Sequence, residues 1–181
     1  MRVIETALPD VKIIVPSRFE DSRGFFSESY NARGFNKLIG SNVQFVQDNH
    51  SYSTKGTLRG LHYQIAPKQQ AKLVRVVAGE VYDVVVDMRK SSPTFGLWVS
   101  VLLSGRNGYQ LWVPEGFAHG FYVLSESADY LYKTTEYYSK EHERNISWND
   151  PDLAISWPLS DAPNLSPKDG SAVQFKYAEY L

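Results

Sequence analysis

The chain has 181 residues, of which 43% are hydrophobic and 22% are charged, which predicts one globular domain spanning residues 1–181. A formal net charge of -1 excludes bulk electrostatic attraction to nucleic acid or to an anionic membrane surface. Because cysteine is absent, disulfide bonds, thiolate metal sites and cysteine nucleophiles are excluded as well.

The first 22 residues contain no long apolar stretch followed by a small-residue cleavage site, so no signal peptide is predicted. No apolar run approaches the ~18–20 residues that a membrane helix needs. A chain without cysteine is also compatible with a reducing compartment. We therefore expect a cytoplasmic protein with neither a membrane nor a nucleic acid as partner.

Short apolar runs separated by Gly, Pro, Asn or Ser dominate the chain, a pattern typical of many short antiparallel strands. The predicted strands are residues 11–15, 25–28, 44–47, 72–78, 81–87, 97–103, 109–113, 120–124 and 130–134. Residues 74–87 predict a hairpin that turns near Gly79. Its second arm alternates only in part, so both faces of that arm are expected to be covered.

Helical signals are few. Residues 31–39 predict one short helix that ends at Gly40, a plausible C-cap. Ser166, Pro167 and Asp169 predict a second helix start, with Ser as N-cap, Pro at the first position and an acid at the third. With roughly 10% helix expected, the chain is predicted to be all-β, a sandwich or barrel rather than a layered α/β protein.

The four histidines are the first candidates for acid–base chemistry. His50, His62 and His119 lie in or beside predicted strands, whereas His142 lies in a charged, solvated segment. A lone histidine in a strand is more often structural than catalytic. Further observations are needed to single one out.

His62 stands apart because of its neighbours in residues 56–64. In a regular strand Arg59 would point to the face opposite His62. A bulge or local twist near Gly60 would bring Arg59 to the same side, and glycines in strands often mark such places. The alternative is that Gly60 is a packing glycine and Arg59 a surface ion-pair partner.

The segment Pro114-x-Gly116-x-x-His119 leads into an apolar strand and resembles the second motif of the cupin superfamily. The motif implies a double-stranded β-helix barrel in which a tight turn delivers His119 to the barrel mouth. Metal-binding cupins carry His-x-His and a Glu in their first motif, where this chain has His62, Tyr63 and Gln64. Two histidines and an amide are a poor ligand set for a catalytic transition metal, so we predict no metal and no cofactor.

Ordered motifs extend this resemblance from about residue 19 to residue 169. They read DSRGFF (21–26), QDNHS (47–51), LRGLHYQ (58–64), KLVRV (72–76), DVVVDMR (83–89), PEGFAHGF (114–121) and WNDP (148–151). Together they resemble the successive signatures of the dTDP-4-dehydrorhamnose 3,5-epimerase family. The resemblance implies a cupin-type jelly-roll barrel with a few short peripheral helices. It also implies an isomerase that inverts C3 and C5 of dTDP-4-dehydro-6-deoxy-D-glucose in dTDP-L-rhamnose biosynthesis.

The resemblance also implies catalytic roles. His62 matches the base, Asp169 its partner, Lys72 the cation near the C4 oxygen, and Tyr132 the proton donor on the opposite face of the sugar. Each residue has a plainer alternative: Asp169 could only cap the C-terminal segment, Lys72 could be a strand-edge charge, and Tyr132 could be a core residue.

Other residues match the family's contacts with nucleotide and sugar. They are Arg23, Glu28, Gln47, Asp48, Asn49, Arg59, His119, Glu143 and Lys168. Arg and Lys suit a diphosphate because they form charge-assisted, sometimes bidentate, hydrogen bonds. The resemblance further implies a homodimer in which the region of Arg23 and Glu28 reaches the neighbouring subunit's site. Phe19, Phe26 and Tyr138 are candidates for stacking on thymine.

Three other functions stay open at this point. A relative that inverts only C3 or only C5 would use the same base and acid. A metal-dependent cupin would need a bound metal ion. A non-catalytic binder of nucleotide sugars would not need His62, Lys72 and Tyr132 together.

Overall fold

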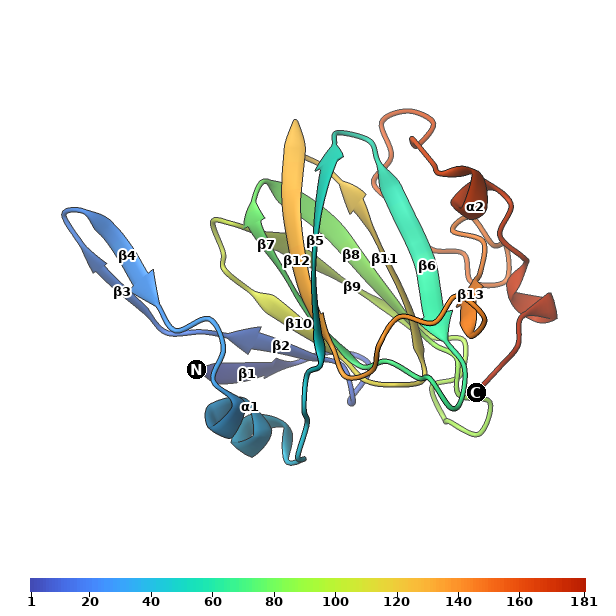
Figure 1. Ribbon diagram of the computed structural model, residues 1–181. Coiled ribbons are helices and arrows are strands. Elements are labelled where there is room, and N and C mark those ends of the chain that lie inside the picture. Colours follow the sequence, from blue (N-terminus) through green and yellow to red (C-terminus); the bar gives the residue numbers. More distant parts are fainter.

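Two antiparallel sheets lie face to face in the computed structural model, which describes residues 1–181 (Figure 1). The six-stranded sheet has the order β1 (Arg2–Glu5), β2 (Lys12–Val15), β10 (Gln110–Val113), β7 (Lys72–Ala78), β12 (Ser127–Thr134) and β5 (Gln47–Thr54). The five-stranded sheet has the order β13 (Glu143–Asn145), β6 (Leu58–Gln64), β11 (Phe117–Val123), β8 (Glu80–Asp87) and β9 (Trp98–Ser104). The chain is 44% strand and 8% helix, which confirms the all-β jelly-roll prediction.

The main core fills the space between the two sheets. Its 15 buried residues come from strands of both sheets, for example Val76 of β7 facing Val85 of β8 and Phe121 of β11. The six-stranded and five-stranded sheets share no strand pair. Their separation is therefore set by side-chain packing rather than by backbone hydrogen bonds.

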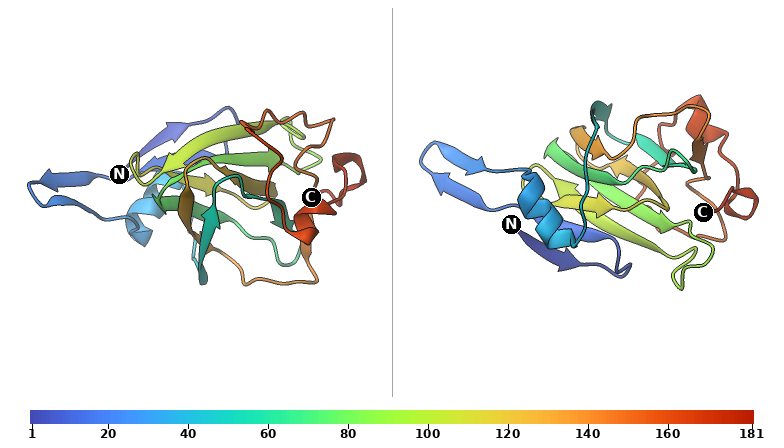
Figure 2. Two further views of the ribbon diagram at one scale, coloured as in Figure 1. Left: turned by 90° about the horizontal axis from the view of Figure 1, so that it is seen from above. Right: turned by 60° about the horizontal axis from the view of Figure 1, so that its bottom comes forward.

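Two peripheral segments cover the outer faces of the sheets. Helix α1 (Ala32–Ile39) places Phe35 against Trp112 on the six-stranded sheet. The C-terminal segment, which includes α2 (Pro167–Gly170) and the 3-10 turn Phe175–Tyr177, covers the five-stranded sheet through Leu153 and Phe175 (Figures 1 and 2).

A separate hairpin, β3 (Arg18–Asp21) and β4 (Gly24–Ser27), projects away from the body in every view (Figures 1 and 2). Three aromatic side chains on it, Phe19, Phe25 and Phe26, are 58–70% exposed. The base of the hairpin is held by Arg18, which donates hydrogen bonds to the carbonyls of Gly105 and Arg106.

Both predicted helix ends are confirmed. The side chain of Asn31 accepts a hydrogen bond from the Gly34 amide at the start of α1, and Gly40 closes the helix in the left-handed conformation with φ +71°. At α2, Ser166 is the N-cap and Pro167 occupies the first turn. No helix of the chain is both long and apolar enough to cross a membrane.

The predicted hairpin over residues 74–87 is wrong. The chain does turn at Gly79, but β7 pairs with β10 and β12, whereas β8 pairs with β11 and β9. Val76 and Val81 are both buried in the main core, so the two strands face each other across it from different sheets. The chain therefore crosses from one sheet to the other at Gly79 instead of folding back within one sheet.

The strand predicted over residues 44–47 is misplaced, because β5 begins at Gln47 and continues to Thr54. Its residues alternate between half-buried and exposed, but they are polar on both faces. A pattern of apolar residues at every second position, the usual sign of a half-buried strand, is therefore missing from β5. The other predicted strands are confirmed within a few residues of their ends, and β1, β3 and β13 were not predicted.

Candidate active site

A cavity of about 280 Å³ opens between the two sheets and α2. It is lined by Ser51, Arg59, His62, Lys72, His119, Gly120, Phe121, Tyr130, Tyr132, Glu143, Ser166, Lys168 and Asp169. Eight of the predicted site residues are thus brought together: His62, Tyr132, Asp169, Lys72, Arg59, His119, Glu143 and Lys168. The remaining five lie elsewhere.

The wall formed by β6 and β11 is irregular at two glycines. His119 pairs with His62 but Phe121 pairs with Arg59, so β6 carries one extra residue. A Cβ atom on Gly60, whose φ is +124°, would lie 2.6 Å from Gly120 Cα. This close approach confirms the predicted bulge, and both Arg59 and His62 line the cavity.

His62 is held by Asp169, which lies 107 residues further along the chain. His62 Nε2 is 2.5 Å from Asp169 Oδ1, and the carboxylate is almost fully buried. His62 Nδ1 has no partner within the chain, and no buried polar side-chain atom is unpaired, so Nδ1 faces the cavity. With Nε2 donating to the carboxylate, Nδ1 is the nitrogen that can accept a proton.

The protonation states of this pair follow from their surroundings. Burial lowers the pKa of His62, and the hydrogen bond and charge of Asp169 only partly offset that effect. Burial raises the pKa of Asp169, but the hydrogen bond from His62 and the further polar contacts outweigh it, so that pKa lies below its usual value. The pair is therefore a neutral imidazole beside a carboxylate, the combination that suits a general base.

Lys72 is a buried cation in the same cavity. Its ammonium donates to the backbone oxygen of His62 at 3.3 Å and contacts no carboxylate within hydrogen-bond distance. Burial lowers the pKa of Lys72 to about 8, although Asp83 and Glu143 raise it in part. A desolvated ammonium with free donors is suited to stabilising a developing negative charge.

Tyr132 approaches from the other sheet. It lies on β12, in register with Asn49 of β5, whereas His62 lies on β6. Burial first, and the charge of Glu143 second, raise the pKa of Tyr132, so its hydroxyl keeps a proton to donate. A proton acceptor and a proton donor therefore line one cavity from facing sheets.

A buried network lies beneath the cavity. Tyr130 donates to Asp83 Oδ2 at 2.5 Å, and His119 Nε2 lies 2.9 Å from Asp83 Oδ1. All three residues are buried, with at most 6% of their surface exposed. Because Asp83 accepts from both neighbours, the network fixes the orientation of His119 at the cavity wall.

Charged side chains gather at the rim. Lys168 Nζ is 2.7 Å from Glu143 Oε1, and Tyr138 donates to Glu143 Oε2 at 3.0 Å. Arg59 donates to Ser53 Oγ and to the carbonyl of Tyr52. This rim therefore offers two cations, Arg59 and Lys168, beside one carboxylate.

Three of the predicted residues lie on β5. Gln47 donates to Asn49 and accepts a hydrogen bond from the Tyr138 amide, but neither Gln47 nor Asn49 lines the central cavity. Asp48 points outward, forms an ion pair with Lys133 at 2.8 Å and lines a separate cavity of about 440 Å³ on the outer face of the sheet. The structure does not bring Asp48 to the central cavity.

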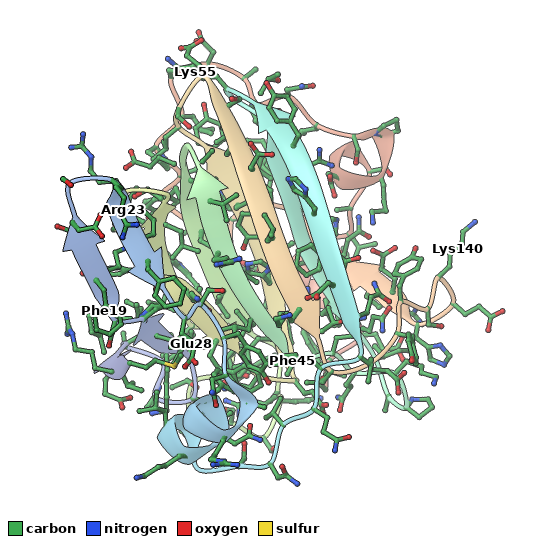
Figure 3. The ribbon with its side chains drawn as sticks, turned by 60° about the vertical axis from the view of Figure 1, so that its left-hand side comes forward. Phe19, Arg23, Glu28, Phe45, Lys55 and Lys140 are labelled. Carbon is green, nitrogen blue, oxygen red and sulfur yellow. The ribbon has the colours of Figure 1, made fainter.

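Arg23 and Glu28 also lie outside the cavity. Arg23 is at the tip of the projecting hairpin, paired with Asp21, and its side chain is 88% exposed (Figure 3). Glu28 lies just beyond β4, where Asn31 donates to its carboxylate. Neither residue lines the cavity that contains His62.

Residues of the site that the sequence reasoning did not assign are Asp83, Tyr130 and Ser166. Asp83 is the acidic residue in the interior of β8, which begins with Glu80 and ends with Asp87, and a fully buried carboxylate needs partners. An acidic residue in the interior of a buried strand is a signal by which Asp83 could have been identified. Nothing in the sequence shows that its partner is Tyr130. Ser166 was predicted only as a helix cap.

No group of three or more His, Cys, Asp or Glu side chains is arranged to hold a metal ion. His62 and His119 are adjacent in register, but each ring has its Nε2 bound to its own carboxylate. The absence of a metal requirement stays a prediction.

Comparison with known proteins places these features in a family. A family model described as dTDP-4-dehydrorhamnose 3,5-epimerase matches residues 5–177. The chain is 58% identical over 181 residues to a dTDP-4-dehydrorhamnose 3,5-epimerase of Shigella flexneri, with 100% of this chain and 99% of that protein covered.

Solved structures agree. The crystal structure of dTDP-6-deoxy-D-glucose-3,5-epimerase from Legionella pneumophila Philadelphia 1, in complex with dTDP-4-keto-L-rhamnose, is 53% identical. It has a TM-score of 0.95 and covers 98% of this chain and 94% of that one. A 3'-monoepimerase from Streptomyces bikiniensis, in complex with dTDP-quinovose, is 32% identical with a TM-score of 0.90, covering 97% and 88%.

Proposed function

The chain belongs to the dTDP-4-dehydrorhamnose 3,5-epimerase family, and from this premise we propose that it epimerises C3 and C5 of dTDP-4-dehydro-6-deoxy-D-glucose. The product is dTDP-4-dehydro-L-rhamnose, an intermediate of dTDP-L-rhamnose biosynthesis. The C4 ketone acidifies the hydrogens on both neighbouring carbons. The reaction therefore needs a base on one face of the ring, an acid on the other and a charge that stabilises the enolate oxygen.

His62 is the base in this proposal. Its free Nδ1 faces the cavity, and Asp169 holds the opposite nitrogen and stabilises the imidazolium that forms. Positioned acid–base groups of this kind are typically worth about 10²–10⁴ in rate. The buried, ionised Asp169 also keeps His62 from turning within the cavity.

Lys72 and Tyr132 complete the chemistry. The buried ammonium of Lys72 stabilises negative charge on the C4 oxygen as a proton leaves C3 or C5. Tyr132, whose phenol is neutral, returns a proton from the opposite face of the ring. Inversion follows because the proton leaves toward one sheet and returns from the other.

The remaining predicted residues bind the nucleotide sugar. Arg59 and Lys168 at the rim suit the diphosphate, because both can form charge-assisted bonds to phosphate oxygens. His119 and Glu143 line the same cavity, and Gln47 and Asn49 of β5, which contact each other and the Tyr138 amide, are assigned to the nucleotide. Asp48, which points to the outer face, is left out of this assignment. The binding of a dianion to a chain of net charge -1 then depends on local cations.

The active form is a homodimer in this proposal. Arg23 and Glu28 do not line the cavity of their own chain, and the projecting hairpin exposes three phenylalanines. A second copy would cover these aromatic rings, and its cavity would receive Arg23 as a further phosphate ligand. A cytoplasmic location stays a prediction.

The observation that carries the proposal is that His62 and Tyr132 line one cavity from facing sheets, with Lys72 in the same cavity. The test is incubation of the 4-keto-6-deoxyglucose nucleotide with the enzyme in D₂O, followed by NMR. Deuterium is expected at both C3 and C5 at enzyme-dependent rates. His62→Ala should slow both exchanges by about 10²–10⁴.

Controls separate the alternatives. Exchange at one carbon alone would make the protein a C3-only or C5-only epimerase, and unchanged exchange in His62→Ala would exclude this site. A non-catalytic binder would give no enzyme-dependent exchange. Enzyme dialysed against EDTA should exchange deuterium at the same rate as untreated enzyme. A loss of exchange that an added metal ion restores would support a metal-dependent cupin instead.

A further inference from the structure

The hydroxyl of Ser166 makes two hydrogen bonds to a single residue. Ser166 Oγ accepts from the backbone N–H of Asp169 at 3.1 Å, which caps α2. The same Oγ donates to Asp169 Oδ2 at 2.7 Å. The Ser166 side chain therefore both caps the helix and binds the carboxylate of Asp169 within it.

This double contact determines how Asp169 meets His62. A carboxylate is planar, so fixing Oδ2 on Ser166 also fixes the direction of Oδ1, which lies 2.5 Å from His62 Nε2. Asp169 is 4% exposed, so water cannot replace a lost partner without entering the cavity wall. The hydroxyl thus completes a chain from Ser166 through Asp169 to His62.

The pKa shifts of Asp169 and His62 are consistent with these hydrogen bonds. Burial raises the pKa of Asp169, and the hydrogen bonds from His62 and Ser166 are among the contacts that bring it below its usual value. Removing the hydroxyl would weaken the hold on the ionised carboxylate. Asp169 in turn raises the pKa of His62 against the effect of burial.

We propose that Ser166 is a positioning residue of the epimerase, which orients the Asp169 carboxylate so that His62 presents Nδ1 to the sugar. This inference rests on the proposed function of His62 as the base. Its role is distinct from helix capping, because capping needs only an oxygen that accepts, whereas positioning needs a hydroxyl that donates to Oδ2.

The chain offers variants that separate the two roles. Ser166→Ala removes both hydrogen bonds. Ser166→Gly removes the hydroxyl but is well tolerated at a helix N-cap, and Ser166→Thr keeps the hydroxyl. Ser171→Ala is the matched control, because Ser171 is the C-cap of α2 and its Oγ donates only to the backbone carbonyls of Pro167 and Lys168.

The experiment has two readouts on the full-length protein. The first is kcat and KM for the nucleotide sugar, where Ser166→Ala and Ser166→Gly should lower kcat by roughly 10- to 100-fold, as for outer partners of functional histidines. KM should change by less than about twofold. Ser166→Thr and Ser171→Ala should stay close to wild type.

The second readout is NMR titration of the His62 ring in the protein without substrate. The pKa of His62 should fall in Ser166→Ala and Ser166→Gly, because a less well oriented carboxylate stabilises the imidazolium less. The proposal is overturned if Ser166→Ala and Ser166→Gly both keep the wild-type His62 titration and the wild-type kcat. It is also overturned if Ser171→Ala lowers the His62 pKa and kcat as much as they do. Because this titration needs no turnover, it still tests Ser166 if wild-type protein fails to exchange deuterium, an outcome that would refute only the proposed function.

Discussion

At the scale of single residues, Lys72 is unusual because it is a cation inside the barrel without a carboxylate partner. Its pKa is lowered to about 8 by burial, whereas the pKa of Tyr132 is raised. Deprotonation near pH 8 is therefore assigned to the ammonium rather than to the phenol.

This difference predicts a bell-shaped dependence of kcat/KM on pH. Activity should rise with pH as His62 loses its proton, with a midpoint below the usual histidine value because burial lowers its pKa. Activity should then fall with a midpoint near pH 8 as Lys72 becomes neutral. Initial rates across pH 5 to about 10 at low substrate concentration measure both limbs.

Substitution assigns the falling limb. Lys72→Arg stays charged over this range, so its falling limb should move to higher pH, and Lys72→Met should lose about 10²–10³ in rate with the loss of charge stabilisation. Lys55→Met, at an exposed ion pair with Glu126, is the control and should leave the profile unchanged. A falling limb that stays near pH 8 in Lys72→Arg would contradict the assignment.

Three candidate catalytic residues could be singled out from the sequence, His62 and Lys72 within the ordered motifs and Tyr132 from the family resemblance, and the structure brings all three to one cavity. The residues that hold these side chains in place could not be predicted. Asp83 and Tyr130 are 47 residues apart, and Ser166 appeared only as a helix cap. A hydrogen bond between distant buried side chains depends on the packing of two sheets, which local patterns do not encode.

At the scale of elements, the contact between β6 and β11 depends on two glycines. Gly60→Ala should destabilise the protein by about 2–5 kcal/mol, because the new Cβ would meet Gly120 Cα at 2.6 Å and the carbonyl of His119 at 2.8 Å in a positive-φ backbone. Urea unfolding followed by circular dichroism measures the loss.

The control for this prediction is Gly34→Ala in helix α1, where the nearest atom to a new Cβ is 3.7 Å away. It should be neutral or stabilising by up to about 1 kcal/mol. If Gly60→Ala unfolds at the wild-type urea concentration, the two strands are free to separate and the close approach does not fix the position of His62.

The errors of element prediction have a common physical origin. Strand β5 was misplaced because its inner face borders a polar cavity rather than the apolar core. The chain segment through Gly79 was predicted as a hairpin because strand periodicity does not reveal which sheet a strand joins. Helix ends were predicted correctly because Asn31, Gly40 and Ser166 act through local hydrogen bonds and dihedral angles.

At the scale of the whole molecule, the exposed hairpin predicts that active sites are shared between subunits. Arg23→Ala and His62→Ala chains should each have low activity alone. Mixed after subunit exchange, they should recover about one quarter of wild-type activity, because half of the dimers are mixed and each mixed dimer has one intact site.

The reason is that a mixed dimer joins a cavity with intact His62 to a partner with intact Arg23. If Arg23 served its own cavity, no mixed dimer would contain an intact site and no activity would return. Light scattering at the assay concentration gives the oligomeric state, and a mixture of Arg23→Ala with Arg23→Lys chains controls for simple stabilisation on mixing.

The two sheets share no strand pair, so the distance between Tyr132 and His62 depends on side chains packed between the sheets, such as Val76 and Val85. Trimming or enlarging one of these residues changes how far the phenol sits from the imidazole, while every group that touches the sugar keeps its identity. Substitutions in the core, which do not touch the substrate, can therefore change the proportions of the epimers that such an enzyme forms.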